Sequence, residues 1–439
     1  MKRKKMPTAT GCYQGPCARC SLRYGSRIVA NGKVKGRKLV VLGSGFGGYS
    51  LVRRLKRSPH AVTVISPHNY FLFTPLLPSA VSGSVEFRSI LEPLRRRQRH
   101  AQLLEAVAKG VDFDRRRVLC RSAVSEEEFT VDYDVLVIAV GAAVADYGVA
   151  GIKRYALGLA SVEEGQALRR AVLTQFARAA IPGLPLAEVE HRLRFVVVGG
   201  GPTGVEVAAE IHDLLRGELA RSFPELSPVA RVVLVEAGSR LLGSFDQALS
   251  EYTRRHFLRE GIELRMGSAV ARIEQSEIFF ADGRTLRPGL VVWAGGNAPV
   301  PLVAALGLET TSGGRIKIDR YLRVPGHENV FAVGDCAAYG DRPLPATAQV
   351  AQQQGEYLAQ NLAKPGALEP FSFRRFGMLA YIGAGKALAD LPRMQWSGRS
   401  AWLFWRSVYL TKLVSPANKV KVLFDWVKAK IFGRDLSRF

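Results

Sequence analysis

The chain of 439 residues is poor in cysteine and has no long apolar run. Its five cysteines, Cys12, Cys17, Cys20, Cys120 and Cys336, are too few and too unevenly spaced for a disulfide framework. The absence of about eighteen consecutive apolar residues excludes an ordinary membrane-spanning helix. With 47% apolar and 23% charged residues, a disordered or collagen-like chain is also excluded. We therefore expect a folded protein of two or three domains in a reducing compartment.

Acidic residues are scarce at both ends of the chain, whose net charge is +24. Residues 1–38 contain eleven Lys or Arg and no Asp or Glu, and residues 396–439 contain nine basic and two acidic residues. The residues between these ends are close to balanced. Both ends therefore favour an anionic partner, and charge alone does not choose between nucleic acid and the anionic face of a membrane.

Three of the cysteines, Cys12, Cys17 and Cys20, stand in the basic amino-terminal stretch. Their spacing resembles that of an iron–sulfur or zinc site, but three thiols without a nearby histidine are one ligand short. We expect a disordered tail with free thiols and no metal. The tail lacks the apolar core of a secretory signal, and its Arg-rich, acid-free composition leaves a transit peptide open.

Two copies of one strand–turn–helix–strand unit are predicted. In each copy, a short apolar run ends at a glycine cluster, a helix follows, and a second apolar run closes the unit. The predicted elements are strands Lys38–Leu42 and Ala61–Ile65 around a helix Tyr49–Arg57, and strands Phe195–Val198 and Arg231–Val235 around a helix that ends at Leu215. Further strands are predicted at Val135–Val140, Leu290–Trp293 and Val330–Val333. Alternating strands and helices indicate an α/β fold with mainly parallel sheets.

Each unit carries the spacing GxGxxG at its turn. The glycines are Gly43, Gly45 and Gly48 in the first unit and Gly199, Gly201 and Gly204 in the second. The first glycine permits a tight turn, the second admits a pyrophosphate, and the third lets helix and strand pack closely. Two such units predict two dinucleotides, of which a nicotinamide nucleotide and a flavin are the economical pair for hydride transfer.

The residue at the end of each second strand helps to assign the two cofactors. Glu236 could accept hydrogen bonds from an adenosine ribose and would repel the 2′-phosphate of NADP, which favours NADH. Two observations leave NADPH open: Arg240 nearby could bind a phosphate, and the spacing from the glycine turn to Glu236 is longer than usual. Glu236 could also be simply an exposed acid at the end of a strand. In the first unit, Ser66 occupies the equivalent position, so that carboxylate is missing.

An ordered set of segments resembles a known family. Five segments resemble the two-dinucleotide-binding flavoproteins: Val41–Gly45, Phe71–Pro78, Tyr133–Ala142, Val198–Glu206 and Val330–Asp335. Two further features narrow this resemblance to the type II NADH dehydrogenases, namely Thr347–Gly355 and the basic, Trp-rich carboxyl end. That family consists of single-chain NADH:quinone oxidoreductases that do not pump protons. The resemblance runs from about Arg37 to the end of the chain.

The resemblance implies two Rossmann-like domains, an FAD domain with an inserted NADH domain, and a carboxyl-terminal amphipathic region that associates with membranes. We expect the boundaries 1–37 for the basic extension, 38–160 and 301–370 for the two parts of the FAD domain, 161–300 for the NADH domain, and 371–439 for the carboxyl-terminal membrane-associating or dimerisation region.

The resemblance also implies the site residues. For FAD they are Gly43, Gly45, Phe46, Gly47, Gly48, Ser66, Thr74, Gly141, Asp335 and Gln349, and for NADH they are Gly199, Gly201, Gly204, Glu206, Glu236 and Gly295. For proton transfer or contact with the quinone headgroup they are Glu206, Gln349, Gln352 and Gln353. From the residues alone, Gln349 and Gln353 share one helical face, which a solvated helix would equally explain.

Three alternatives remain open. A sulfide:quinone oxidoreductase would need paired thiols near the flavin, and only Cys120 is left in the core to partner Cys336. A soluble NADH oxidase would share the same fold. A redox-sensing or nucleic-acid-binding flavoprotein would explain the basic ends, but the aromatic residues there are not set in an RNA-binding motif, so we expect no nucleic-acid partner.

The carboxyl end predicts an amphipathic helix after the N-cap Ser415 and Pro416. One face carries Val420, Leu423, Phe424, Val427 and Ile431, the opposite face carries Lys421, Asp425 and Lys428, and Lys419 and Lys430 lie on the flanks. We expect this helix to lie in the plane of an anionic lipid surface. The alternatives are packing on its own core or on a second copy of the chain. The expected location is the cytoplasmic face of the inner membrane, or an organelle membrane if the tail is a transit peptide.

Overall fold

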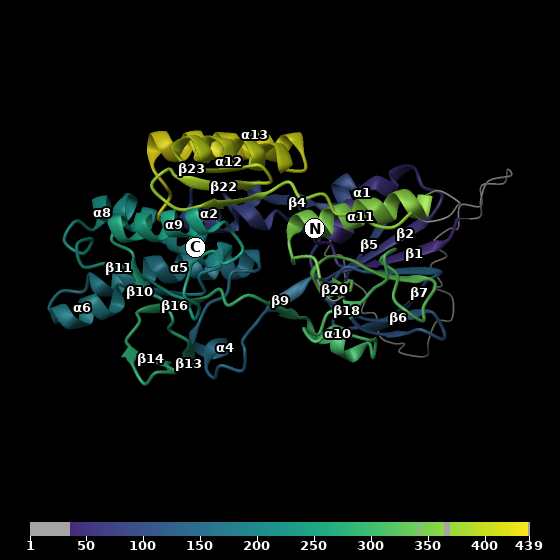
Figure 1. Cartoon of the computed structure of the whole chain (residues 1–439), viewed down its shortest axis with the longest axis horizontal. Helices are drawn as coiled ribbons and strands as arrows, with labels where there is room; N and C mark the ends of the chain where they lie inside the picture. The colour runs from purple at the N-terminus through teal and green to yellow at the C-terminus, as the bar shows by residue number, and fades with distance from the viewer. Residues whose placement is uncertain (1–35, 341–342, 364–368, 438–439) are drawn as a thin grey trace, which may run out of the picture. The chain divides into compact units, whose positions relative to one another are not determined.

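The computed structural model describes residues 36–340, 343–363 and 369–437 (Figure 1). Within them lie two mainly parallel sheets, each containing one of the predicted units. Cys12, Cys17 and Cys20 lie outside the described residues, so the expectations for the amino-terminal tail stay predictions.

The first sheet has seven strands. They are β1 (Lys38–Leu42), β2 (Ala61–Ser66), β5 (Ala101–Asp112), β6 (Arg117–Ser122), β7 (Glu128–Asp132), β8 (Val135–Ile138) and β19 (Val330–Ala332). Their order is β19-β8-β1-β2-β5-β6-β7, with parallel pairing from β19 to β5 and antiparallel pairing from β5 to β7. All of β8 and β19 and four of the five residues of β1 are buried, as expected for strands covered on both faces.

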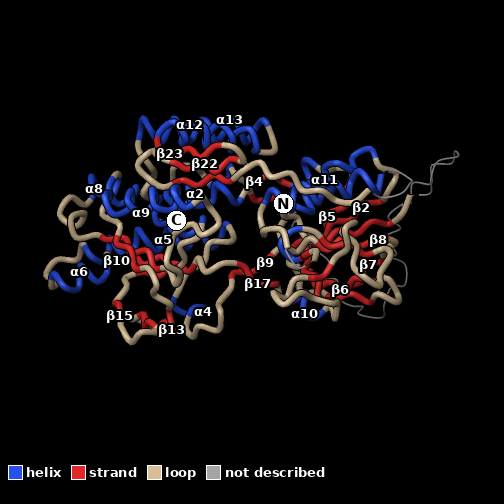
Figure 2. Tube along the Cα trace, in the orientation of Figure 1, coloured by secondary structure: helices blue, strands red, loops and turns tan. Residues whose placement is uncertain are grey.

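The second sheet has four strands, β10 (Arg194–Val198), β11 (Arg231–Val235), β12 (Glu263–Arg265) and β16 (Leu290–Trp293). They pair in parallel in the order β12-β11-β10-β16. The chain leaves the first sheet along β9 (Ala142–Val144) and returns along β17 (Asn297–Pro299), and these two strands pair with each other. Figure 2 shows this ribbon between the two groups of strands. The second unit is therefore inserted into the first.

The carboxyl-terminal region contains a third, antiparallel sheet of β21 (Met378–Tyr381), β22 (Ala387–Leu391) and β23 (Met394–Gly398). It is followed by the helices α12 (Arg399–Lys412) and α13 (Pro416–Phe432), and α12 packs on β22 and β23. The sequence predicted α13 from its N-cap, and the Ser415 hydroxyl indeed accepts a hydrogen bond from the Asn418 N–H, 3.2 Å away. The three-stranded sheet itself was not predicted.

The remaining elements connect these sheets or cover them. The helices are α1 (Phe46–Arg54), α2 (Leu77–Ser82), α3 (Leu94–Arg97), α4 (Ile152–Tyr155), α5 (Val162–Ala179), α6 (Leu186–Arg192), α7 (Pro202–Arg216), α8 (Glu218–Ser222), α9 (Gln247–Glu260), α10 (Pro301–Ala305) and α11 (Ala348–Ala363). The short strands are β3 (Tyr70–Leu72), β4 (Leu91–Pro93), β13 (Val270–Ile273), β14 (Ile278–Phe280), β15 (Thr285–Leu286), β18 (Ile316–Lys317) and β20 (Ala337–Ala338), and the 3₁₀ turns are η1 (Leu55–Arg57), η2 (Thr74–Leu76), η3 (Phe87–Ser89) and η4 (Gly334–Cys336).

Some boundaries differ from those that the sequence predicted. The first helix begins at Phe46, directly after the glycine turn, and not at Tyr49. It ends at Arg54 and continues as the 3₁₀ turn η1. The strand predicted to end at Val140 ends at Ile138. Glycines are weak helix formers, so the sequence did not indicate the first turn of α1. This turn supplies the free backbone N–H groups of a phosphate site.

Candidate active site

The glycine turn of the first unit lies between β1 and α1. Gly43 has a φ of +100°, and a Cβ there would come within 2.3 Å of the Ala139 carbonyl oxygen. A Cβ on Gly48 would lie 2.1 Å from the Gly43 oxygen. By contrast, a Cβ on Gly45 would meet no described atom within 4 Å. Two glycines are therefore required by packing, and the third faces open space.

The glycine turn of the second unit repeats this geometry. Gly199 has a φ of +114°, and a Cβ there would approach the Ala294 oxygen to 2.3 Å. A Cβ on Gly204 would lie 1.9 Å from the Gly199 oxygen, and one on Gly201 would meet nothing in the described chain within 4 Å. Gly295 lies at the same edge, because the Gly199 Cβ would also stand 3.4 Å from the Gly295 nitrogen. The structure thus brings the predicted residues of this turn together.

Both turns lead into a helix whose first N–H groups face an open side. The N-caps of α1 and α7 are Gly45 and Gly201, and no described side chain caps either helix. Neither first turn contains an acidic residue. Free N–H groups and the positive end of the helix dipole attract a phosphate. Each turn therefore fits one pyrophosphate group.

The residues at the ends of β2 and β11 contact the glycine turns in equivalent ways. In the first unit, the Ser66 hydroxyl lies 2.9 Å from the Ser44 hydroxyl. In the second, the Glu236 carboxylate accepts from the N–H groups of Gly200 at 2.5 Å and Gly238 at 2.6 Å. These two bonds fix the carboxylate beside the turn and leave other lone pairs of its oxygens for a ligand hydroxyl.

Arg240, which the sequence left as a candidate phosphate ligand, is engaged elsewhere. Its Nη2 donates to the backbone oxygens of Gly243 at 2.7 Å and Phe245 at 2.9 Å. The guanidinium therefore holds the loop before α9. This reduces the case for recognition of a 2′-phosphate by Arg240.

Asp335 lies in η4, directly after β19, at the edge of the first sheet. Burial raises the pKa of its carboxyl, and the nearby Arg315 guanidinium opposes this shift. The preceding Gly334 donates its N–H to the buried Gln354 amide oxygen at 2.7 Å. Sequence reasoning did not assign Arg315 or Gln354 a role. The position of Gln354 directly before Gly355, on the helix beside the turn, is the signal that could have found it.

The other residues expected at the first dinucleotide differ in their surroundings. Gly141 has a φ of +70° and a Cβ there would meet no described atom within 4 Å, whereas a Cβ on Gly47 would press on Val333 at 3.0 Å. Gly47 therefore serves the packing of α1 against the end of β19. Phe46 packs edge-on against Phe71 with ring centroids 5.0 Å apart, and Thr74 is exposed at the start of η2.

Gln349 and Gln353 share one face of α11, as their spacing predicted, but both amides bind the backbone of one neighbouring segment. Gln353 donates to the Arg374 oxygen at 2.9 Å and accepts from the Arg374 N–H at 3.0 Å. Gln349 donates to the Gly377 oxygen at 2.6 Å and accepts from the Phe376 N–H at 3.3 Å. The two side chains therefore attach the extended segment before β21 to α11.

Gln352 does not join this pair. Its amide donates to Glu356 at 3.2 Å, and Glu356 forms an ion pair with Arg54 of α1 at 3.1 Å. Gln352 therefore belongs to the contact between α11 and α1.

Glu206 is 8% exposed on α7, five residues after the N-cap Gly201. Its carboxyl accepts from the Tyr381 N–H at 3.0 Å. The pKa of Glu206 is raised to about 8, mainly by burial and in smaller part by the charge of Glu210, while the Tyr381 bond opposes the shift. Burial therefore favours the protonated form of this carboxyl.

Two further carboxyls follow Glu206 on the same face of α7, and sequence reasoning missed both. Glu210 accepts from the hydroxyls of Ser79 at 2.7 Å and Ser82 at 2.5 Å, and burial raises its pKa. Asp213 accepts from the Tyr381 hydroxyl at 2.6 Å, and burial raises its pKa too. The signal was present in the sequence, because acids at steps of four and three after Glu206 lie on one helical face.

Cys336 is fully buried, and its thiol lies 3.2 Å from the Val333 oxygen and 3.5 Å from the Ile138 oxygen. Burial raises the pKa of this thiol to about 11. Because the thiolate is the reactive form, this environment disfavours a thiol mechanism. In the described part of the chain, no group of three His, Cys, Asp or Glu residues could hold a metal ion.

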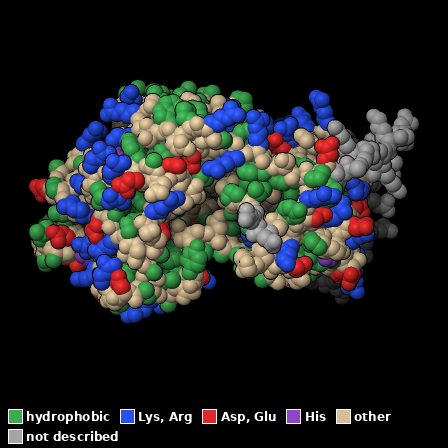
Figure 3. Space-filling model, in the orientation of Figure 1, with side chains coloured by type: hydrophobic (Ala, Val, Ile, Leu, Met, Phe, Trp, Pro, Cys, Tyr) green, Lys and Arg blue, Asp and Glu red, His purple; other side chains and the backbone are tan. Residues whose placement is uncertain are grey.

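The inward face of α13 carries the buried Asp425 together with Val422 and Trp426, and the predicted apolar face points outward. Asp425 accepts from the Glu86 N–H at 3.1 Å, and Lys428 forms an ion pair with the Glu86 carboxylate at 2.8 Å. The predicted apolar residues are all exposed: Val420, Leu423, Phe424, Val427 and Ile431. Figure 3 shows hydrophobic side chains gathered along the upper edge, where Figure 1 places α13, with Lys and Arg beside them. The helix packs on its own core through its other face, and these five residues do not take part in that packing. Among the described helices, none is long and apolar enough to cross a membrane.

Comparisons with known proteins agree with this geometry. Residues 37–355 match the family model of the pyridine nucleotide-disulphide oxidoreductases, and residues 376–435 match that of the NDH2 C-terminal domain. A probable NADH dehydrogenase of Dictyostelium discoideum is 38% identical over 416 residues, which cover 92% of each chain. The external NADH-ubiquinone oxidoreductase 2 of Saccharomyces cerevisiae mitochondria is 37% identical, over 94% of this chain and 84% of its own. The solved structure of NDH2 from Plasmodium falciparum in complex with NADH superposes with a TM-score of 0.88 at 25% identity, over 91% of this chain and 99% of its own. The chain therefore belongs to the pyridine nucleotide-disulphide oxidoreductases and, among them, to the NDH2-type NADH dehydrogenases, as the resemblance in its sequence predicted.

Proposed function

We propose that the chain is an NADH:quinone oxidoreductase that holds FAD in its first unit and binds NADH at its second. The observation that carries this proposal is the pair of glycine turns, each with one glycine open to a ligand and two closed by packing. Bound FAD supplies the redox chemistry, because it can accept a hydride from NADH and pass two electrons to a quinone.

In the first unit, the N–H groups after Gly45 bind the FAD pyrophosphate, and Asp335 accepts from the hydroxyls of the ribityl chain. Arg315 and Gln354 both hydrogen-bond the backbone of Gly334, and this positions the adjacent Asp335. Both turns stand at the carboxyl ends of parallel strands, which is where α/β sheets bind their ligands. Ser66 takes the place of the usual carboxylate and holds the turn through Ser44.

In the second unit, Glu236 accepts hydrogen bonds from the adenosine ribose of NADH. The carboxylate is already oriented by two backbone N–H groups, so little ordering is needed on binding. Its negative charge would repel a 2′-phosphate, and Arg240 is bonded to the backbone of residues 243 and 245. We therefore propose a preference for NADH over NADPH.

Glu206 handles a proton during turnover. Reduction of a quinone to a quinol consumes two protons, and a neutral carboxyl beside the reacting groups can donate one of them. Replacement by Gln keeps the shape and removes this proton. A Glu206→Gln variant should bind NADH normally and lose quinone turnover. Full turnover in this variant would remove Glu206 from the role.

Gln349 and Gln353 support the quinone site by position. Their amides are occupied by the backbone of Arg374, Phe376 and Gly377, so their contribution is to fix this segment beside α11. The relatives named above include an NADH-ubiquinone oxidoreductase, and we propose a quinone of that class as the electron acceptor.

The apolar face of α13 docks on an anionic lipid surface. Val420, Phe424 and Ile431 are each about two-thirds exposed, which is costly in water and favourable among acyl chains. Lysines beside this face add electrostatic attraction to anionic headgroups. A lipid-dissolved quinone would then reach the protein from the membrane. The expected location is the surface of a respiratory membrane, and several relatives are mitochondrial by name.

A flotation assay with vesicles of phosphatidylcholine and phosphatidylglycerol tests the docking. A Phe424→Ser, Ile431→Ser double variant should stay in the dense fraction, whereas the control Val124→Ser, an exposed apolar residue far along the chain from α13, should float like wild type. Equal flotation of all three proteins would refute the proposal. If the double variant instead becomes monomeric and still floats, the face joins two copies of the chain.

One experiment tests the function as a whole. The purified protein is titrated anaerobically with NADH and then with a soluble quinone, while the flavin spectrum is followed. We expect bleaching by NADH and recovery with quinone. A colourless protein that does not take up FAD, or a flavin that sulfide bleaches and NADH does not, would contradict the proposal.

A further inference from the structure

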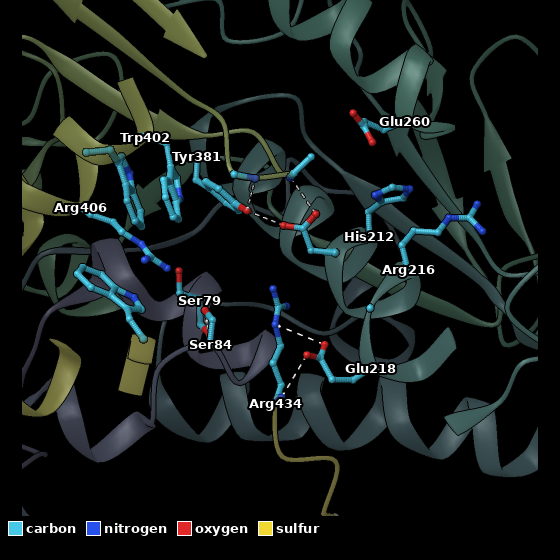
Figure 4. A pocket seen from close by; sticks show the side chains of 16 residues that line it. Ser79, Ser84, His212, Arg216, Glu218, Glu260, Tyr381, Trp402, Arg406 and Arg434 are labelled. Atoms are coloured by element: carbon cyan, nitrogen blue, oxygen red, sulfur yellow. Dashed lines mark hydrogen bonds and ion pairs between the residues drawn. The ribbon is translucent and has the colours of Figure 1, made fainter. Parts of the chain in front are cut away.

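A pocket of about 440 Å³ lies at the far end of α7 from its glycine turn (Figure 4). Its walls come from α2, α7, α8, α9, β21, α12, α13 and the segment after α13. The helix α7 has 15 residues, which corresponds to about 22 Å, so this pocket is separate from the turn at Gly201. Nothing in the proposed reaction uses it.

Arg406 is the unusual residue of this pocket. Its guanidinium carbon lies 3.9 Å from the centre of the Trp402 ring and 4.6 Å from the centre of the Trp426 ring. Within the described ranges, no carboxylate or carbonyl oxygen forms a hydrogen bond or ion pair with this guanidinium, and its Nε is buried without a partner. Two aromatic rings therefore hold this half-buried cation in place, and Glu210 acts on it only through its charge, without a hydrogen bond or ion pair.

Arg434 faces Arg406 across the pocket. Its Nε lies 3.6 Å from Glu218 and its Nη1 lies 3.7 Å from Glu210, which are ion-pair distances longer than a hydrogen bond. Its Nη1 is also buried without a hydrogen bond. Figure 4 shows both guanidinium groups pointing into the same space. Donors are thus in excess at this end of the pocket.

The carboxylates that line the pocket already have partners. Asp213 accepts from the Tyr381 hydroxyl and from the Ala384 N–H at 3.0 Å. Glu260 lies 3.8 Å from Lys386. A cationic ligand would have to displace these partners, whereas an anion meets unused donors directly.

We propose that this pocket binds a phosphate group through Arg406 and Arg434. The arginine fork suits both carboxylate and phosphate, but the two arginines approach from different walls. The oxygens of a phosphate are distributed over a tetrahedron and can meet both forks at once, whereas a carboxylate has only two oxygens in one plane. The phosphate is either free inorganic phosphate or the headgroup of a phospholipid, since Trp402 and Trp426 stand on the two helices that we expect at the membrane.

The first experiment uses the flavin-loaded enzyme and inorganic phosphate. Phosphate should raise the unfolding midpoint relative to chloride at equal ionic strength, because it binds the folded state. Arg406→Gln should weaken the apparent affinity about 10-fold or more, as expected for loss of charge-assisted hydrogen bonds. Arg399→Gln removes the same charge from an exposed position of the same helix and should match wild type. Phosphate bound at the glycine turn of the second unit is common to all variants, so the difference isolates the pocket.

The second experiment separates the two sources. Vesicles of phosphatidylcholine with phosphatidic acid are compared with vesicles of phosphatidylcholine with oleate at the same charge density. Preference for phosphatidic acid that Arg406→Gln abolishes and Arg399→Gln keeps identifies a lipid headgroup. Stabilisation by inorganic phosphate with no such lipid preference identifies the free ion.

Flavin absorbance shows that each variant is folded. Arg406→Lys keeps the charge but loses the fork and the stacking, so its affinity for phosphate should lie between those of wild type and Arg406→Gln. The proposal is overturned if Arg406→Gln and Arg399→Gln behave alike in both experiments, or if wild type responds neither to phosphate nor to phosphatidic acid.

Discussion

Glu206→Gln should change the pH dependence of stability in a way that follows from the buried carboxyl. In the unfolded chain the pKa of this carboxyl is 4.5, and in the fold burial raises its pKa to about 8. Between these values the folded protein keeps a proton that the unfolded chain has lost. The unfolded state binds fewer protons, so the free energy of unfolding falls as the pH rises through this window and is level above it.

The magnitude follows from the interval between the two pKa values. It corresponds to about 5 kcal/mol of stability that the wild type loses between about pH 4.5 and about pH 8. Glutamine does not titrate, so the variant does not lose it. For a chain of 439 residues, an unfolding entropy of about 0.9 kcal/mol per kelvin converts this into about 5 °C. The variant should therefore gain about 5 °C on the wild type between acid and mildly alkaline pH.

The assay is thermal unfolding of the flavin-loaded proteins, followed by tryptophan fluorescence from about pH 5 to about pH 9. Glu225→Gln, an exposed acid, serves as the matched control and should show a constant difference from wild type. If the difference between Glu206→Gln and wild type is equally constant, the carboxyl is ionised throughout and the reasoning from its burial fails.

Three further outcomes are expected. Gly48→Ala should lower the unfolding midpoint, because the methyl group would lie 2.1 Å from a carbonyl oxygen. Gly45→Ala should remain folded and lose flavin absorbance, because its methyl group would occupy only the open side of the turn. The opposite pattern would refute the assignment of the open glycine. Gln353→Ala should lower the free energy of unfolding by about 1–3 kcal/mol through two lost backbone bonds and expose the segment before β21 to proteolysis, and unchanged cleavage would show that Gln353 does not hold it. Cys336→Ala should keep NADH:quinone turnover within about two-fold of wild type, since burial holds the pKa of this thiol at about 11, and a large loss would revive a thiol mechanism.

The parallel strands could be predicted from the sequence because they are buried on both faces. Runs such as Phe195–Val198 contain only apolar residues and end at glycine. A buried parallel strand is the element that fits a run of this length and composition. The strands β21 to β23 lacked this signal. In Met394–Gly398, for example, no residue is fully buried, and the segment mixes Gln, Trp and Ser. Short antiparallel strands of this kind are defined by their pairing partners, and the sequence does not name those.

The site shows the same division between local and distant information. Gly43 and Gly48 could be predicted because the positive φ of Gly43 and the close approach of Gly48 to the Gly43 oxygen both arise within a turn of six residues. The spacing of Gln349 and Gln353 gave the correct shared face but could not show what lies opposite that face. The partner is the backbone of Arg374, 21 residues further along the chain, where a backbone N–H and oxygen carry no side-chain signal. The structure shows which backbone these two side chains bind, and their direct contact with the quinone stays a prediction.

The orientation of α13 is set by an inward face on which Val422 and Trp426 are buried beside polar residues with partners. Helical periodicity identified two faces but did not show which one faces the protein. Asn418 donates to the Leu91 oxygen at 2.9 Å, and Asp425 and Lys428 bind the backbone and side chain of Glu86. Turning the helix to bury its apolar face would break all three contacts and leave their partners unsatisfied, at about 1–3 kcal/mol for each buried group. The contacts to residues 86 and 91 therefore hold the apolar face toward the outside. A helix docked on lipid requires this arrangement, whereas a helix that covers its own core with this face would have the reverse one.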